Sequence, residues 1–401
     1  MTPLLPQALG LRLRRKIHAH PLLSRLVPPA LLFAGRAAVL RALLERDPEA
    51  LRRATAAHPA GRFRPGELRF LFHLAKSSHL PEDAYRDFIA ILATGFLDAH
   101  AVALRGLCQA IGFADATRFT HDILPYRGLA SLFLDKMTIA RTHADDATIF
   151  LKVCVHLEEN PDIRRQLDER GIRVPALLWT GPIGGFTAAA YPYISGGHPP
   201  LKTLDEFHAV VDLARTLSTL RVARRRDRVT SVFAIRPDDI PDGLPPEDQA
   251  RFRHVFGWLA AHEDRVRTRL AALPEGFNHS DFSLQNLLVQ DGELVLLDYA
   301  GGGMGFLSYD LAYFLFNALE SVLALHDGDL AAVIATSIAR FHGPEAHPDI
   351  RRAAEWLFLL VGLNLGHYQL GRPEYAYADV FRERFLPYLR RMETFLSEAS
   401  A

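Results

Sequence analysis

The sequence predicts an α+β fold in which a small antiparallel sheet lies between two helical parts of the chain. Apolar residues recur every three or four positions through much of residues 1–123 and again from Leu204 onwards, which is the period of an amphipathic helix. Residues 124–196 are instead rich in Phe, Ile, Val, Leu and Thr, with turn-forming stretches between the runs. A chain of 401 residues is long enough for two or three domains. We therefore expect three parts, with the last at 197–401.

The composition is that of a folded protein without net charge. The chain has 46 Lys and Arg against 46 Asp and Glu, and 49% of its residues are hydrophobic, which argues against disorder. Binding of nucleic acid through charge requires an excess of Lys and Arg on one face, so no nucleic-acid partner is expected. Cys108 and Cys154 are the only cysteines, which excludes a disulfide framework and a four-cysteine zinc site. A reducing, cytoplasmic setting fits best.

Residues 1–123 are expected to form helices only, as a helical N-terminal extension. The stretches 34–46, 67–76 and 83–113 have helical periodicity and carry no recognisable chemistry, so a packing role is the main interpretation. The alternative is contact with a membrane surface or a partner. The basic stretch 11–20 beside an apolar one permits such peripheral attachment.

No membrane-spanning segment or secretory signal is expected. The first charges follow the first apolar residues rather than precede them. The longest run without Asp, Glu, Lys or Arg, at 174–201, holds five prolines and five glycines, which a membrane helix would not tolerate.

Residues 124–196 are expected to form a sheet with one short helix. Asn160 is a suitable cap for that helix, Pro161 suits its first position, and Gly171 is suited to end it. The THADDA stretch can turn the chain between the first two strands, which predicts an antiparallel pair. The four expected strands are 130–140, 147–157, 174–180 and 186–194.

The segment after residue 277 carries the clearest chemical pattern. His279 and Asp281 are followed by Asn286, and an Asp-Gly turn at 291–292 between two apolar runs predicts a hairpin that returns Asp298 towards Asn286. Carboxylate and amide oxygens are the ligands that Mg²⁺ accepts beside phosphate oxygens. Asp281 would face the remaining space and could accept a proton from a hydroxyl. The alternative interpretation is that so short a pattern of His279, Asp281 and Asn286 arose by chance. Asp281 would then be an ordinary solvent-exposed turn residue.

With this spacing the chain resembles the aminoglycoside phosphotransferase and choline kinase family of protein-kinase-like small-molecule kinases. The agreement continues through Gly303-Met304 to Asp310-Leu311-Ala312, at the offsets that choline-kinase-like proteins share. The resemblance implies a bilobal protein-kinase-like fold, with a small-sheet N-lobe at 124–196 and a helical C-lobe at 197–401.

The resemblance also implies roles for individual residues. Asp281 would be the catalytic base, and Asn286 and Asp298 would hold Mg²⁺. Asp310 would brace the catalytic loop from the following helix, and His279 would pack beneath that loop.

A kinase-like fold further needs a lysine on its third strand to neutralise the phosphates of ATP. Lys152 lies at the expected place, within IFLKVCV. A lysine that only keeps a strand soluble is the ordinary alternative. However, the chain has 41 arginines and only five lysines, so a lysine at this place favours a functional role over one in solubility. Glu159 is the candidate for the glutamate that pairs with Lys152, although Asn160-Pro161 indicates that the helix begins after it.

Departures from the family pattern bear on the acceptor. Ser280 stands where the family usually has Gly. Ala300 and Phe306-Leu307 stand where choline kinases have carboxylates, which disfavours a cationic acceptor. Arginines crowd residues 221–228, and they form either a solvated basic loop or a site for an anionic acceptor or an acidic membrane surface.

The expected function is ATP- and Mg²⁺-dependent phosphoryl transfer to a hydroxyl of a small molecule or sugar, with an anionic acceptor as one option. One alternative is a kinase for an envelope glycan or a lipid-linked sugar. The other is a nucleotide-binding scaffold without turnover, which the presence of Lys152, Asp281, Asn286 and Asp298 together disfavours. The sequence does not indicate an oligomeric state.

Overall fold

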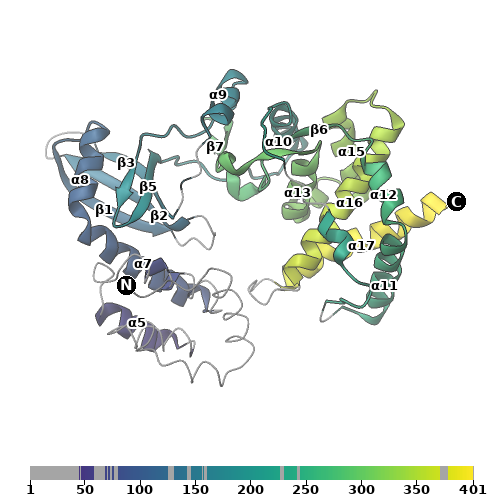
Figure 1. Cartoon of the computed structure of the whole chain (residues 1–401), viewed down its shortest axis with the longest axis horizontal. Helices are drawn as coiled ribbons and strands as arrows, with labels where there is room; N and C mark the ends of the chain where they lie inside the picture. The colour runs from purple at the N-terminus through teal and green to yellow at the C-terminus, as the bar shows by residue number, and fades with distance from the viewer. Residues whose placement is uncertain are drawn as a thin grey trace. The chain divides into compact units, whose positions relative to one another are not determined.

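The structure is a computed structural model of the whole chain (Figure 1). The structure describes residues 45, 47–57, 68–69, 71–72, 75, 80–124, 131–141, 146–155, 157, 160–225, 230–241, 244–370 and 378–400. Two compact units are present, and each is described by itself. The first comprises Met1–Leu157 and Ala176–Tyr193, and the second comprises Glu158–Pro175 and Ile194–Ala401.

The first unit is built on a five-stranded antiparallel sheet with the order β1-β2-β3-β5-β4. In β2 and β3, fully buried residues alternate with half-buried ones, so one face of the sheet is a core face and the other is more accessible. The strands are β1 (Ala116–Leu124), β2 (Ser131–Arg141), β3 (Ala147–Cys154), β4 (Trp179–Ile183) and β5 (Phe186–Pro192).

Helices cover the core face of this sheet (Figure 1). They are α7 (Glu82–Ala99) and α8 (Ala101–Ala110), and α5 (Pro48–Ala57) packs against α7. The apolar stripe of α7 is fully buried, because residues such as Phe88 and Phe96 lie in one cluster with Phe133 and Met137 of β2. Phe96 meets Phe133 edge-on, with ring centroids 5.9 Å apart.

The sheet begins earlier than the sequence pattern predicts. The expectation that residues up to 123 are helical is wrong for β1, an edge strand that starts at Ala116. Its hydrophobic alternation is weak because no residue of the strand is fully buried, and Thr117, Arg118 and Thr120 are exposed. The expected strand at 174–180 also differs, because β4 begins only at Trp179.

The second unit is helical and contains two short antiparallel pairs. The strands are β6 (Glu275–Asn278) with β9 (Gly303–Phe306) and β7 (Leu287–Gln290) with β8 (Glu293–Leu296). Helix α16 runs through the core, and its residues from Ala353 to Leu363 are buried except for the half-buried Glu355. The helices are α9 (Pro161–Glu169), α10 (Leu204–Leu217), α11 (Pro246–Ala261), α12 (Glu263–Leu270), α13 (Tyr309–Asn317), α14 (Leu319–Ala324), α15 (Leu330–His342), α16 (Pro348–Leu370) and α17 (Ala378–Ser400).

The start and end predicted for the short helix after β3 are confirmed by α9. The side chain of Asn160 accepts a hydrogen bond from the amide of Ile163 at 3.1 Å, and Pro161 occupies the first helical position. Gly171 follows the helix with φ of +67°, where a residue with a side chain would be strained. Leu167 of this helix is buried in the core of the second unit.

The predicted hairpin is also confirmed. Leu287 pairs with Leu296 and Gln290 with Glu293, so the connection has two residues. Asp291 and Gly292 have φ of +54° and +80°. Positive φ at both central positions is the requirement of the type I′ turn that Asp-Gly favours.

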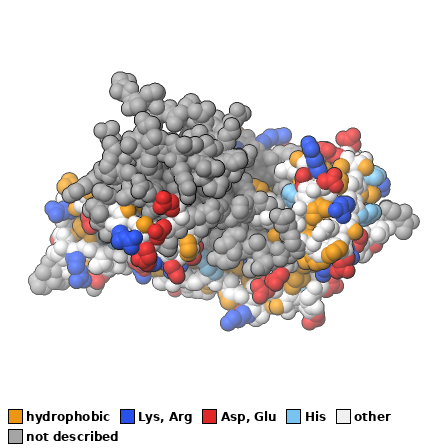
Figure 2. All heavy atoms as spheres, turned by 90° about the horizontal axis from the view of Figure 1, so that it is seen from below, with side chains coloured by type: hydrophobic (Ala, Val, Ile, Leu, Met, Phe, Trp, Pro, Cys, Tyr) orange, Lys and Arg blue, Asp and Glu red, His pale blue; other side chains and the backbone are white. Residues whose placement is uncertain are grey.

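Among the described residues, no single helix is long and apolar enough to cross a membrane. Helices α7 and α8 reach that length and hydropathy only as a pair bent by 75°. On the face of the molecule that Figure 2 shows, Lys and Arg side chains of the described residues are interspersed with Asp and Glu side chains.

Candidate active site

Asp310 holds the backbone of the loop that follows β6. The side chain lies in the first turn of α13 and is only 4% exposed. Its two carboxylate oxygens accept hydrogen bonds from the amides of His279 and Ser280, the second at 3.0 Å. A buried carboxylate is stable when it accepts such bonds, and it fixes the backbone that donates them. The loop at 279–281 is therefore positioned from α13.

His279 packs inside this loop and does not face solvent. Its ring is 1% exposed and meets Phe282 edge-on at 6.2 Å between centroids. Nε2 lies 2.7 Å from the carbonyl oxygen of Leu297. Because a carbonyl only accepts, Nε2 carries the proton and Nδ1 is left to accept from the amide of Asp281 at 3.4 Å. His279 thus links the loop to the residue before Asp298.

Asp281 presents an exposed carboxylate that two neighbours hold in place. Oδ1 accepts from the hydroxyl of Tyr313 at 2.9 Å, and Oδ2 accepts from Nδ2 of Asn286 at 3.0 Å. Tyr313 lies three residues after Asp310 on α13, so both point from one helix face towards the loop. The sequence reasoning missed Tyr313, although this spacing from Asp310 was a signal that could have found it.

Asn286 and Asp298 flank the open end of the β7–β8 hairpin. Nδ2 of Asn286 also donates to the carbonyl of Asp281 at 2.7 Å, and its Oδ1 accepts no hydrogen bond from the described residues. The amide of Leu297 donates to the carbonyl of Asn286 at 2.9 Å, which extends the hairpin ladder to the residue before Asp298. Asp298 is exposed and has φ of +54°.

This donor set fits Mg²⁺. No cluster of three or more His, Cys, Asp or Glu suited to a metal occurs in the part of the chain that the structure describes. An amide oxygen and one carboxylate are nonetheless what Mg²⁺ usually takes from a protein when phosphate oxygens and waters complete its shell. Asn286 and Asp298 are the residues that would hold such an ion.

Lys152 lies in the first unit, on the face of the sheet opposite the helices. It pairs with Leu134 of β2 and Ala189 of β5, whereas Leu151 and Val153 point into the helix-covered core. Lys136, two residues along β2 from Leu134, shares the face of Lys152 as a diagonal neighbour.

Lys136 is a residue that the sequence reasoning did not single out. Its Nζ lies 4.6 Å from the centroid of the Tyr193 ring, a distance suited to a cation–π contact. Two of the five lysines of the chain therefore lie side by side on one accessible sheet face. Glu159, the expected partner of Lys152, lies outside the described residues.

The arginine-rich segment 221–228 is used in part for internal contacts. Arg221 donates to the carbonyls of Ser218 and Leu220 after α10, and Arg225 pairs with Glu275 at 3.1 Å. Residues 226–229 lie outside the described part of the chain. An anionic site at this segment, the alternative to a solvated basic loop, therefore stays a prediction.

The backbone at Ser280 gives a testable expectation. Ser280 has φ of +79°, the left-handed region in which a side chain costs about 1–2 kcal/mol. We expect Ser280→Gly to raise the free energy of unfolding by about 0.5–1 kcal/mol, since the higher entropy of Gly in the unfolded chain offsets part of the gain. Urea denaturation measures it. Ser283→Gly is the matched control, because Ser283 has φ of −130° and Gly should destabilise there. Equal effects at both positions would contradict the expectation.

The fold is that of a kinase-like phosphotransferase. The structure of a choline kinase from Cryptosporidium parvum Iowa II is similar to the chain with a TM-score of 0.51 and 15% identity, over 75% of this chain and 97% of that one. A choline/ethanolamine kinase family protein from Mesorhizobium loti matches with a TM-score of 0.44 and 17% identity, over 73% and 99%. An aminoglycoside phosphotransferase from Streptomyces rimosus matches with 0.38 and 16%, over 65% and 98%.

Residues 144–360 match the model of the phosphotransferase enzyme family. This region is more than half of the chain, so the chain belongs to that family, and the resemblance that the sequence motifs predicted is confirmed. The predicted bilobal α+β fold, with a small antiparallel sheet and a helical second part, is confirmed as well. No curated protein matches the chain significantly by sequence.

Proposed function

We propose that the protein transfers the γ-phosphoryl group of ATP, with Mg²⁺, to a hydroxyl of a small molecule or sugar. The observation that carries the proposal is the arrangement around Asp281. An exposed carboxylate is held by Tyr313 and Asn286, on a loop whose amides bind the buried carboxylate of Asp310. In phosphoryl transfer, the attacking hydroxyl must give up its proton to a group held at a fixed position, and the carboxylate of Asp281 is such a group.

The proposed mechanism depends mainly on positioning and charge. The acceptor oxygen attacks the γ-phosphorus, its proton passes to the carboxylate of Asp281, and the bond to the β–γ bridging oxygen breaks to release ADP. The bonds from Tyr313 and Asn286 keep the carboxylate oriented for that proton. When bound, Mg²⁺ neutralises phosphate charge, and Asn286 and Asp298 would hold it. Lys152 is proposed to bind the phosphates as a compact charge.

The chemistry near Asp298 argues for an acceptor without positive charge. Ala300 is half-buried and apolar, and Phe306 pairs with Glu275 in the β6–β9 ladder. Neither supplies a carboxylate for a cationic group. A neutral or anionic acceptor is therefore favoured over choline-like compounds, in line with the sequence-based expectation.

The deciding experiment measures ATP consumption and product formation with Mg²⁺ on pooled compounds. Separate pools of small metabolites, free sugars and lipid-linked or polymeric glycans distinguish the acceptor classes. Asp281→Ala is the control, because it removes the proton acceptor and keeps the binding residues. A phosphorylated product formed only by the unchanged protein supports the proposal. Nucleotide binding without product in any pool would favour a scaffold.

Nucleotide affinity provides a separate prediction for the two sheet lysines. We expect Lys152→Gln to weaken binding of a non-hydrolysable ATP analogue ten- to a hundredfold, because a charge-assisted hydrogen bond is worth about 1.5–3 kcal/mol. Lys136→Gln should weaken it by a smaller factor, since its ammonium is also held over the Tyr193 ring. Titration calorimetry measures both.

The control for these variants is Lys202→Gln, a lysine that is exposed and lies before α10. An equal loss of affinity for Lys202→Gln would mean that only net charge matters. An unchanged affinity for Lys152→Gln would contradict the proposed role of the sheet face.

A further inference from the structure

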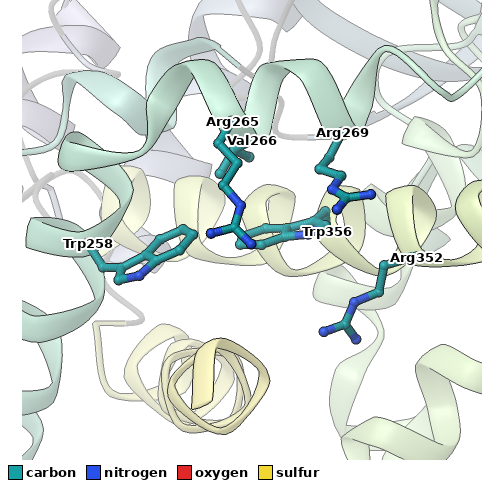
Figure 3. Close-up of a pocket in the computed structure, with 6 residues that line it drawn as sticks. All are labelled: Trp258, Arg265, Val266, Arg269, Arg352 and Trp356. Atoms are coloured by element: carbon teal, nitrogen blue, oxygen red, sulfur yellow. The ribbon is translucent and has the colours of Figure 1, made fainter. Parts of the chain in front are cut away.

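A small pocket lies in the second unit between α11, α12 and α16 (Figure 3). Its volume is about 160 Å³. Its lining contains two tryptophans and three arginines, namely Trp258, Trp356, Arg265, Arg269 and Arg352, together with Val266. The residues proposed for phosphoryl transfer lie on other elements, which are β3 of the first unit and, in the second unit, the loop after β6, the β7–β8 hairpin and α13. The pocket is therefore a feature that the proposed function does not use.

Aromatic rings form a rigid wall of this pocket. The indoles of Trp258 and Trp356 are nearly parallel, with 5.8 Å between centroids and 18° between planes. Trp356 is 4% exposed and is held edge-on by Phe395 at 4.8 Å. Trp258 is half-buried, and the ring of His262 stacks on it at 4.1 Å. The wall is thus preorganised, and part of Trp258 is accessible to a ligand.

The arginines leave positive charge at the pocket. Arg265 and Arg269 are exposed, and no carboxylate among the described residues pairs with either. Arg267, between them on α12, is by contrast paired with Glu263. In Figure 3 the side chains of Arg265 and Arg269 extend from α12 towards Trp356.

The third arginine is only partly neutralised. Arg352 pairs with Glu355 at 2.8 Å, and its guanidinium also lies 3.5 Å from the centroid of the Phe395 ring. Glu355 also accepts from Arg391 at 2.8 Å, so one carboxylate serves two guanidinium groups. Arg391 has a second carboxylate partner in Glu398. Among the described residues, Arg352 thus shares one carboxylate with Arg391, and Arg265 and Arg269 pair with none.

We propose that this pocket binds an oxyanion, a phosphate or a carboxylate, carried on a single ring. Guanidinium groups bind such planar or tetrahedral oxyanions through paired N–H donors. The exposed part of an indole packs against the flat face of a ring. The volume sets the size of the ligand, because a cavity of about 150 Å³ accommodates one six-membered ring. A monosaccharide phosphate or a uronate is thus the size class expected, and a whole nucleotide is too large.

Intrinsic fluorescence can test the pocket directly. The chain has three tryptophans, of which only Trp179, on β4 of the first unit, lies outside the pocket. Trp179→Phe leaves both remaining fluorophores in the pocket wall. This variant is titrated, without nucleotide, with glucose 6-phosphate, glucuronate, inorganic phosphate and glucose.

The expected result is a saturable fluorescence change with glucose 6-phosphate or glucuronate. These probes should bind at least tenfold more tightly than glucose, and more tightly than inorganic phosphate, because both the oxyanion and the ring contribute. Tighter binding of glucose 6-phosphate would identify a phosphate as the preferred oxyanion, and tighter binding of glucuronate would identify a carboxylate. Added to the Trp179→Phe background, Arg265→Gln and Arg269→Gln should each weaken binding about tenfold or more, as loss of a charge-assisted hydrogen bond does.

Arg267→Gln is the matched control, because it removes the same charge from the same helix outside the pocket lining. An equal weakening by Arg267→Gln, a glucose affinity equal to that of the anions, or no saturable change would overturn the proposal. Thermal unfolding checks that every variant is folded. Asp281→Ala should bind the probes normally, so failure of phosphoryl transfer and failure of this site remain separate results.

Discussion

Asp310→Asn is expected to lower kcat by about 100-fold and the free energy of unfolding by about 2–3 kcal/mol. The carboxylate of Asp310 is buried and accepts from two amides of the loop, at His279 and Ser280. An Asn side chain has one oxygen and one NH₂ group, so it can satisfy one amide and must present a donor to the other. The loop would then shift, and with it the carboxylate of Asp281.

Steady-state kinetics and urea denaturation together separate positioning from folding. We expect kcat to fall far more than the KM for the nucleotide rises, because the change displaces the proton acceptor and leaves the proposed phosphate-binding lysines unchanged. Asp162→Asn is a suitable control, since Asp162 also lies in the first turn of a helix but its side chain is 83% exposed. An Asp310→Asn protein with full kcat would show that the loop does not depend on this carboxylate.

Features that depend on residues close in sequence could be predicted. The Asn160-Pro161 pair marks the start of α9, and Asp291-Gly292 forms the two-residue turn of the β7–β8 hairpin. The hairpin then fixes where Asp298 returns to Asn286. In each case the backbone preference of two or three residues decides the local geometry, so a reading of the sequence reaches it.

Features that depend on strand register or helix packing could not be predicted. Lys136 joins the face of Lys152 only through the pairing of β2 with β3, and a register shift of one residue would place it in the core. Strand β1 has too few apolar residues to be distinguished from a loop. Tyr313 reaches Asp281 only because α13 packs against the loop.

The pocket lined by Trp258 and Trp356 could not be predicted either, because it too depends on helix packing. Trp258 and Trp356 are almost a hundred residues apart in the sequence, and the packing of helices brings them within 5.8 Å. The arginine cluster that the sequence indicated, at 221–228, lies elsewhere on the chain. Charge density along a sequence therefore identified neither Arg265 and Arg269, which pair with no carboxylate among the described residues, nor the aromatic wall beside them.

A buried ion pair between α11 and α17 leads to the second large expected effect. The carboxylate of Asp248 has no exposed surface and accepts from Arg251 and from Arg390, the latter at 3.0 Å. Asp248→Asn should lower the free energy of unfolding by about 3 kcal/mol, because it removes the buried carboxylate charge that Arg390 and Arg251 share. Arg251 retains Glu393, which limits the loss.

The size of this effect should depend on pH with a definite sign. Burial acts to raise the pKa of Asp248, but hydrogen bonds and charge from Arg390 and Arg251 hold the pKa below its usual value of 3.8. The carboxylate therefore contributes stability above the usual pKa, and that contribution is lost as the pH falls through the lowered value. Urea denaturation at pH 7 and pH 3.5 should show a smaller difference between Asp248→Asn and the unchanged protein at the lower pH. The exposed Asp264→Asn on α12 should change stability by less than about 0.5 kcal/mol at pH 7. A penalty for Asp248→Asn that grows on acidification would show that the pair does not stabilise the charged carboxylate.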